Sequence, residues 1–169
     1  FDSDDVIYYP FGNNTWTVSN GKWKGYTAKV WDPEHPELTA MGYCGGEGDG
    51  TNLIWTLDDK GVLTISGTGK MADYSYSNGI TTAPWGEYAL DLKTLVIGEG
   101  VTSIGSCAFY NCSGFTGNLV IPESVTVIGD SAFARCEGFT GGLTIPNNVT
   151  EIGWYAFDNC SGFTGKLVI

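Results

Sequence analysis

The stretch LVIPESVTVIGDSAFARCEGFTGG, residues 119–142, decides the fold, because near copies of it lie directly before and after it. The preceding copy is LVIGEGVTSIGSCAFYNCSGFTGN (95–118), the following one is LTIPNNVTEIGWYAFDNCSGFTGK (143–166), and LVI restarts at Leu167. Each step is 24 residues without a gap. A fixed step of this size indicates a supersecondary unit that must stack on copies of itself to bury its hydrophobic face. The sequence therefore predicts a solenoid over residues 95–169, with three turns and the start of a fourth.

Apolar residues recur at the same places in every copy and predict the side chains of the core. They are Leu95/Leu119/Leu143/Leu167, Ile97/Ile121/Ile145/Ile169, Val101/Val125/Val149, Ile104/Ile128/Ile152, Ala108/Ala132/Ala156, Phe109/Phe133/Phe157, Cys112/Cys136/Cys160 and Phe115/Phe139/Phe163. The L-x-I triplet alternates as a strand does, so its central residue points outward. The stretch from Ser106 to Cys112 and its copies is too short for a full helix and predicts one or two helical turns. The expected class is therefore α/β, but rich in β structure.

Residues 44–94, before the array, are expected to cap its first turn. A solenoid leaves the core of its terminal unit open, so an atypical end unit is needed there. The runs 53–57 and 62–66, joined by Asp58-Asp59-Lys60-Gly61, predict a β-hairpin whose turn needs glycine at a positive φ. We therefore expect an N-terminal β-hairpin cap.

Residues 1–43 are interpreted as a β extension of the cap or as the tail of a preceding module. Asn20-Gly21 is typical of a two-residue hairpin turn, in which Val18 would face Trp23. The chain begins at Phe1 without an initiator Met and stops inside an apolar run, so both ends are expected to be cuts in a longer protein.

The repeat resembles the BspA-like bacterial leucine-rich repeat, through the pattern L-x-I-P-x-x-V-T-x-I-G-x-x-A-F-x-x-C. The resemblance extends upstream to Cys44, through the segments CGGEGDGTNLIWTLDDKGVLTISGTGKMADY and PWGEYALDLKTLVIGEGVTSIG. It implies a right-handed leucine-rich-repeat solenoid from a bacterial surface protein. It further implies a secreted or cell-surface location and an adhesive or partner-binding role.

Composition excludes several classes of function. The 169 residues carry 19 Asp and Glu against 8 Lys and Arg, a net charge of -11, so nucleic acid is not an expected partner. No apolar run approaches the roughly 18 residues of a membrane helix, so membrane insertion is not expected either. A single histidine, His35, makes a zinc site of the usual kinds improbable, and no metal or cofactor is expected. No nucleotide-binding or hydrolase motif occurs, so the chain is predicted not to be an enzyme.

Three of the five cysteines, Cys112, Cys136 and Cys160, follow the repeat and are predicted to form a buried ladder of free thiols. Parallel Cβ vectors about 4.8 Å apart are poorly placed for a disulfide. The redox state of Cys44 and Cys107 is left open by the sequence, and a catalytic pair of Cys44 with His35 has no recognisable third group.

Candidate binding residues are those where one copy departs from the others at an outward position. Trp154 and Tyr155 stand where other copies have Ser, Asp or Cys, and Tyr110 stands where they have Ala or Asp. Exposed aromatic rings suit protein or sugar recognition; alternatively, Trp154 and Tyr155 pack on a next turn beyond the given sequence or cover a gap in the convex surface. The outward strand row supplies three further candidates, Val96, Val120 and Thr144. In the cap, aromatic residues expected to be exposed are Tyr74, Tyr76 and Trp85.

Two functions are kept from these observations. The first is a non-catalytic extracellular module for binding a protein or a host or matrix surface, because a solenoid offers an extended face and no convergent polar pocket. The second is a carbohydrate-binding accessory module of a larger secreted enzyme. Expected partners are a protein or glycan on a host, matrix or bacterial surface, and the open end at Leu167–Ile169 offers a route to self-association.

Overall fold

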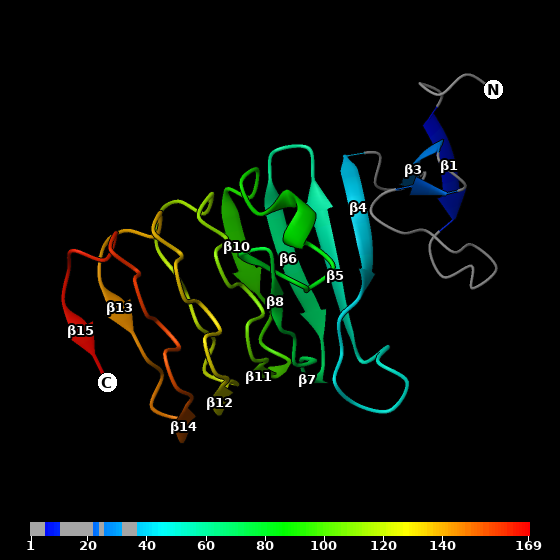
Figure 1. Ribbon diagram of the computed structural model, residues 1–169. Helices are drawn as coiled ribbons and strands as arrows, with labels where there is room; N and C mark the ends of the chain where they lie inside the picture. Colours follow the sequence, from blue (N-terminus) through cyan, green and yellow to red (C-terminus); the bar gives the residue numbers. More distant parts are fainter. Residues whose placement is uncertain (1–5, 11–21, 24–25, 32–36) are drawn as a thin grey trace.

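The protein is a row of short strands and turns stacked along one axis, as the computed structural model in Figure 1 shows from β4 to β15. The structure describes residues 37–169 in full and, before them, the backbone of segments 6–10, 22–23 and 26–31. These segments are three strands in the spatial order β1-β3-β2: β1 (Val6–Pro10), β2 (Lys22–Trp23) and β3 (Tyr26–Trp31). The hairpin predicted around Asn20-Gly21, with Val18 opposite Trp23, lies outside the described residues.

The N-terminal part of the stack is a four-stranded sheet in the order β10-β6-β5-β4. Its strands are β4 (Leu38–Tyr43), β5 (Leu53–Asp58), β6 (Val62–Gly67) and β10 (Thr94–Ile97). The predicted cap hairpin is confirmed, since β5 and β6 pair antiparallel with Leu57 opposite Leu63. Gly61 in its turn has a φ of 78°, and a Cβ there would lie 2.6 Å from the carbonyl oxygen of Asp91. This turn therefore requires glycine for both conformation and space.

The second strand of the hairpin, β6, also begins the first coil of the solenoid. β6 pairs in parallel with β10, and Leu63 and Ile65 face Leu95 and Ile97 in register. Leu63-Thr64-Ile65 is thus an L-x-I triplet, 32 residues before the next one instead of 24. The extra length holds a small hairpin, β8 (Tyr76–Ser77) with β9 (Ile80–Thr81), followed by the 3-10 helix η1 (Gly86–Tyr88). The capping segment is therefore a longer coil of the same kind.

Two further parallel sheets run along the axis. The first has the order β14-β12-β11-β7 and consists of β7 (Gly69–Lys70), β11 (Val101–Ile104), β12 (Val127–Ile128) and β14 (Glu151–Ile152). The second pairs β13 (Leu143–Thr144) with β15 (Leu167–Val168). No strand forms at the L-x-I triplet of residues 119–121, although Leu119 and Ile121 are buried. Pro122 stands where the N–H of Gly98 donates to Ile65 in the preceding coil, and proline has no N–H to donate.

The stretch predicted as one or two helical turns is not helical. Cys107 and Asn111 have φ values of 51° and 56°, and their equivalents in the next two coils are also left-handed. A left-handed residue at every fourth position prevents helical hydrogen bonding. Instead, the N–H groups of Cys107, Phe109 and Asn111 donate to carbonyl groups of the next coil at 2.8 Å. In the described residues the only helical segment is η1, so the fold is β-rich with almost no α component.

Stacked aromatic rings fill the core, as the recurring phenylalanines predict. Phe109, Phe133 and Phe157 form one stack, with ring centroids 5.2 and 5.4 Å apart. The other stack consists of Phe115, Phe139 and Phe163. Trp85 extends the first stack at 5.4 Å from Phe109 and is fully buried, so its predicted exposure is wrong. The reason is that Trp85 takes the Phe position of the longer first coil.

The cysteine ladder lies beside these rings and its thiols are free. Cys112 and Cys136 are buried and Cys160 is partly buried. The Sγ of Cys136 donates to the carbonyl oxygen of Phe109, and that of Cys160 to Phe133, both at 3.0 Å. Cys44 and Cys107, whose state the sequence leaves open, are also free and buried. The thiols therefore belong to the packing of the core.

Candidate functional site

One side of the solenoid, here called the turn face, carries the aromatic side chains that differ between the coils. It is formed by residues 106–111, 130–135 and 154–159, which are equivalent in successive coils, together with the β8–β9 hairpin. Trp154 and Tyr155 lie in its last coil, with 78% and 68% of their surfaces exposed. This is the last coil of the given sequence, and its repeat residue Ile152 is also exposed, to 44%.

The backbone under this pair is fixed by the neighbouring coil. The N–H of Trp154 donates to the Asp130 carboxylate at 2.6 Å, and the carbonyl oxygen of Trp154 accepts from the N–H of Ser131 at 2.8 Å. Tyr155 has a φ of 59°, close to the values of Cys107 and Ser131 at the same repeat position. Because Ser adopts this conformation in the neighbouring coil, the aromatic ring of Tyr155 is not needed to form the turn.

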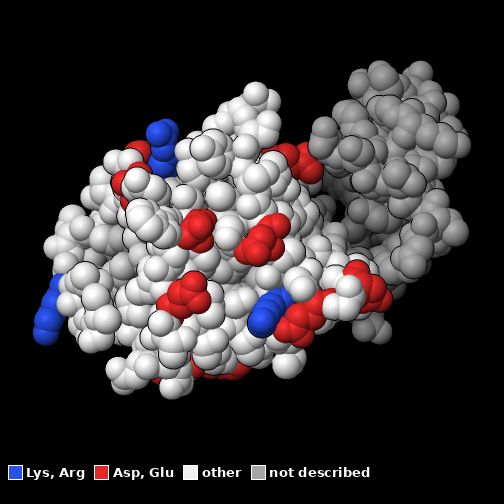
Figure 2. All heavy atoms as spheres, turned by 60° about the horizontal axis from the view of Figure 1, so that its bottom comes forward, with Lys and Arg blue, Asp and Glu red and all other residues white. Residues whose placement is uncertain are grey.

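A shallow hollow of about 300 Å³ lies on the outer side of the sheet β14-β12-β11-β7, and Gly153, the residue before Trp154, is part of its lining. Its wall includes the carboxylates of Asp73, Asp130 and Glu151. Asp73 accepts a hydrogen bond from the N–H of Ser106 at 2.7 Å, just as Asp130 does from Trp154. Figure 2 shows the molecule with this side turned forward, where acidic groups are scattered and basic ones are fewer. Two of the three carboxylates, those of Asp73 and Asp130, thus already accept hydrogen bonds that stabilise turns.

Tyr110, the third aromatic candidate, is half-buried in the first coil of the turn face. The ring of Tyr76, from the β8–β9 hairpin, stacks on it with centroids 4.5 Å apart and planes 14° apart. The guanidinium carbon of Arg135, from the next coil, lies 6.0 Å from the centroid of Tyr110. The sequence did not reveal this cluster, because the insertion that carries Tyr76 falls outside the 24-residue register.

The other cap aromatics differ from each other. Tyr76 is 58% exposed, as predicted. Tyr74 is half-buried and lies edge-on to Trp85 with centroids 5.7 Å apart. Burial raises the pKa of the Tyr74 hydroxyl well above its usual range. Of the three aromatic residues predicted at the surface of the cap, Tyr76 is therefore the exposed one.

The strand-row candidates Val96, Val120 and Thr144 lie on a different side of the molecule from Trp154. All three are exposed, Val120 to 68%. Val96 is in register with Thr64, and Thr144 with Val168, so the row continues in both directions. The structure thus divides the six candidate residues between two surfaces: Trp154, Tyr155 and Tyr110 on the turn face, and the strand row elsewhere.

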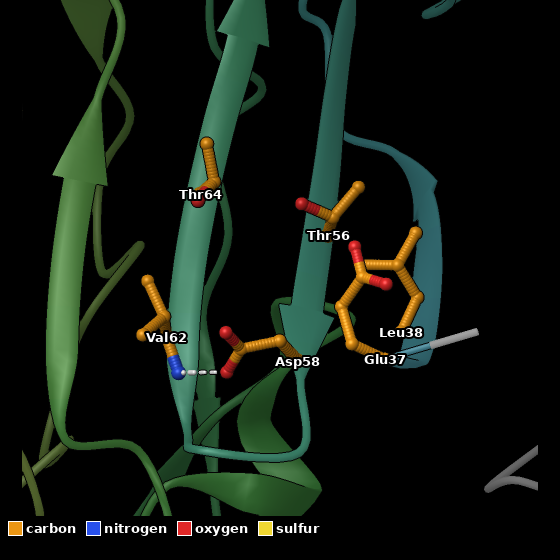
Figure 3. A pocket seen from close by; sticks show the side chains of 6 residues that line it. All are labelled: Glu37, Leu38, Thr56, Asp58, Val62 and Thr64. Atoms are coloured by element: carbon orange, nitrogen blue, oxygen red, sulfur yellow. Dashed lines mark hydrogen bonds between the residues drawn. The ribbon is translucent and has the colours of Figure 1, made fainter. Parts of the chain in front are cut away.

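A second hollow, of about 330 Å³, lies on the outer face of the N-terminal sheet, and Figure 3 shows its lining. Thr56, Thr64 and Val62 form its floor, with the carboxylates of Glu37 and Asp58 at the side. Asp58 accepts hydrogen bonds from the N–H groups of Lys60 and Val62 at 2.9 and 2.8 Å. Its carboxylate therefore holds the hairpin turn.

The described residues contain no group of three or more His, Cys, Asp or Glu side chains that could hold a metal ion. Within the same residues, no helix has the length and apolar character to cross a membrane. The thiols are poor nucleophiles: burial raises the pKa of Cys44 to about 12 and of Cys160 to about 11.

Comparison with known proteins decides the family. The sequence pattern of the BspA type leucine rich repeat region matches residues 87–165, in six copies. The repeat array belongs to the BspA-type leucine-rich repeat family. The family interpretation and the solenoid fold predicted from the sequence are both confirmed by this match.

Two solved structures resemble the chain that carries this array. One is a leucine-rich repeat protein from Eubacterium ventriosum ATCC 27560, with 30% identity, a TM-score of 0.54, and coverage of 75% of this chain and 37% of that protein. The other is a leucine rich cell surface protein from Faecalibacterium prausnitzii A2-165, with 20% identity, a TM-score of 0.38, and coverage of 73% and 42%. The chain thus spans less than half of either protein. Comparison with curated protein sequences gives no match.

Proposed function

We propose that this BspA-type repeat module is a non-catalytic, extracellular binding module of adhesion type. It binds a protein or glycan on a host, matrix or bacterial surface through its turn face, with Trp154 and Tyr155 as anchors. The location outside the cell, or on the bacterial cell surface, is part of the proposal and rests on the family resemblance.

One observation supports the proposal. Trp154 and Tyr155 are adjacent, aromatic and exposed, although the other coils have Ser, Asp or Cys at these two positions. The consensus side chains are occupied with packing between coils, as the buried Phe133 and Ile128 show. Within residues 1–169, Trp154 and Tyr155 keep most of their surface exposed, and rings of this kind offer a partner apolar area with a polar edge. Trp and Tyr are also the residue types most enriched among the energetic anchors of interfaces.

The test is a double substitution that the repeat itself supplies. Trp154→Ser with Tyr155→Ser copies Ser106 and Ser131 of the other coils, so we expect the thermal midpoint to change little. Affinity for a partner from a screen of immobilised matrix proteins and glycans is expected to fall by roughly thirtyfold, or about 2 kcal/mol. The matched control is Val120→Ser with Thr144→Ser, which alters two exposed residues of the strand row.

Unchanged affinity for that partner at unchanged stability would contradict the proposed anchors. A loss confined to the Val120/Thr144 control would move the binding surface to the strand row. A large fall in the thermal midpoint of the aromatic double variant would show that the pair stabilises the fold instead.

A carbohydrate-binding accessory module of a larger secreted enzyme is the second candidate. It is favoured by the hollow whose lining ends at Gly153, the residue before Trp154, and combines carboxylates with the hydroxyls of Ser103 and Ser106. Sugars present hydroxyls and apolar ring faces to such groups. Retention of the chain on insoluble polysaccharide, with loss in the Trp154/Tyr155 double variant, would favour this candidate over a protein partner.

A further inference from the structure

We propose that Tyr76, Tyr110 and Arg135 form a site for an acidic, carboxylate-bearing oligosaccharide. This inference rests on the proposed function, because it assumes that the turn face meets an extracellular partner, and it names the ligand class of a second contact region on that face. The three residues are called the Tyr–Tyr–Arg row below.

The row runs along the axis of the solenoid. Tyr76 comes from the insertion in the first coil, Tyr110 from the next coil and Arg135 from the one after. The two tyrosine rings stack at 4.5 Å, and the guanidinium lies 6.0 Å from the centroid of Tyr110. Two coil steps of about 4.8 Å separate the ends of the row, so it suits an elongated ligand of more than one ring.

Arg135 adds a positive charge to the Tyr–Tyr–Arg row. It is the only arginine in a chain of net charge -11, and the other two coils carry Asn111 and Asn159 at its position. Its side chain is exposed, and no ion pair links it to a carboxylate of the described residues. Asp158, whose carbonyl oxygen accepts the Arg135 N–H, directs its own carboxylate to the side-chain amide of Asn159. The guanidinium therefore remains available to an anion.

The tyrosines are held in place before any ligand arrives. Thr81 of the β8–β9 hairpin donates its hydroxyl to the carbonyl oxygen of Cys107 at 2.7 Å. The side-chain amide of Asn111 donates to the carbonyl oxygen of Gly79 in the hairpin turn at 2.8 Å. Both bonds fasten the insertion to the coil that carries Tyr110. Insertions on one face of a repeat protein often mark its binding face, and a preformed site loses little entropy on binding.

An acidic sugar matches each member of the row. The planar guanidinium binds a carboxylate through paired hydrogen bonds, with a geometry that a neutral hydroxyl does not reproduce. The free face of Tyr76 offers apolar area with a polar edge, which suits the apolar face of a sugar ring. A ligand lying along the row can use both contacts at once.

The experiment compares acidic probes with their neutral counterparts by calorimetry or affinity electrophoresis. The probe pairs are trigalacturonate with its methyl ester, and sialyllactose with lactose. We expect at least one acidic probe to bind tenfold or more tightly than its neutral partner. Arg135→Asn, which copies Asn111 and Asn159, is expected to abolish this preference. Tyr110→Ala, which copies Ala134, is expected to weaken binding of the acidic and neutral probes alike.

Controls separate this inference from the proposed function. Lys166→Asn removes one exposed positive charge elsewhere on the array, so it is expected to keep the acidic preference. The Trp154/Tyr155 double variant is expected to keep it as well.

Equal affinity for both members of each pair, or an acidic preference that survives Arg135→Asn, would overturn the inference. Arg135-dependent binding of polyglutamate without binding of either sugar would also overturn it, in favour of an acidic peptide. Partner binding that still depends on Trp154 would leave the proposed function intact in each case.

Discussion

At the scale of single residues, burial separates equivalent positions of the repeat. Phe133 in the middle of the array is fully buried between Phe109 and Phe157, whereas Phe157 in the last coil is only partly buried. The same side chain in the same register thus has two neighbours on the stack in one coil and one described neighbour in the other.

Replacing Phe133 with Ala is expected to lower the free energy of unfolding by about 3–5 kcal/mol, the usual loss for a fully buried aromatic ring. Phe157→Ala, its matched control, is expected to cost clearly less, because part of that ring already contacts water. Urea unfolding of the two variants measures the difference. Equal losses would contradict the stacking order of the coils.

The thiol ladder makes a second prediction at this scale. At pH 8, Cys112 and Cys136 are expected not to react with a thiol reagent until the protein unfolds, while Cys160, partly buried with a pKa of about 11, reacts slowly. In the unfolded chain the Cys160 thiol ionises near its ordinary pKa of 9.0, so the unfolded state loses that proton first. The free energy of unfolding is therefore expected to fall as pH rises from about 9 to about 11. Fast native labelling of Cys136 would contradict the buried ladder.

At the scale of elements, the β5–β6 and β8–β9 hairpins have turn glycines with the same backbone conformation but different surroundings. Gly61 and Gly79 both have a φ of 78°. A Cβ on Gly61 would collide with the carbonyl oxygen of Asp91, while a Cβ on Gly79 would meet nothing within 4 Å. The first turn is packed against the start of the array, and the second stands open at the turn face.

Alanine substitutions at these two glycines separate the free-energy cost of a steric clash from the cost of the left-handed conformation. Gly79→Ala is expected to destabilise the protein by about 1–2 kcal/mol, the cost of placing a Cβ in a left-handed conformation. Gly61→Ala carries the same conformational cost and an added clash, so its loss should exceed that of Gly79→Ala by about 1 kcal/mol or more. Thermal unfolding compares them, and equal losses would show that the hairpin turn does not pack against residue 91.

The sequence predicted most elements of the array but not all. The core positions, the β5–β6 hairpin and the cysteine ladder follow from apolar periodicity and turn chemistry, which are local. Trp85 was misplaced because the β8–β9 insertion shifts it out of the 24-residue register. The left-handed residues at Cys107 and Asn111 were missed because no glycine marks them. The stacking of Tyr76 on Tyr110 joins two coils of different length, so periodicity alone could not reveal it.

At the scale of the whole molecule, the repeat supports both the fold and the proposed binding face. Each coil packs on its neighbours through the same positions, and the aromatic residues that differ between coils lie on the turn face. The four-stranded N-terminal sheet joins β4, from the segment expected to be an extension, to β10 of the array. The division into residues 1–43, 44–94 and 95–169 stays a prediction.

The central claim is that 24-residue coils are interchangeable units, and deleting one of them tests it most directly. Removing residues 119–142 joins Asn118 to Leu143 and brings Phe109 over Phe157 and Cys112 over Cys160 in the original register. We expect this variant to unfold cooperatively in urea, with a lower midpoint because one interface between coils is lost. Removing residues 119–130 instead shifts the register by half a coil and is expected to abolish the cooperative transition. If the 24-residue deletion abolished it as well, the account of stacked equivalent coils would be contradicted.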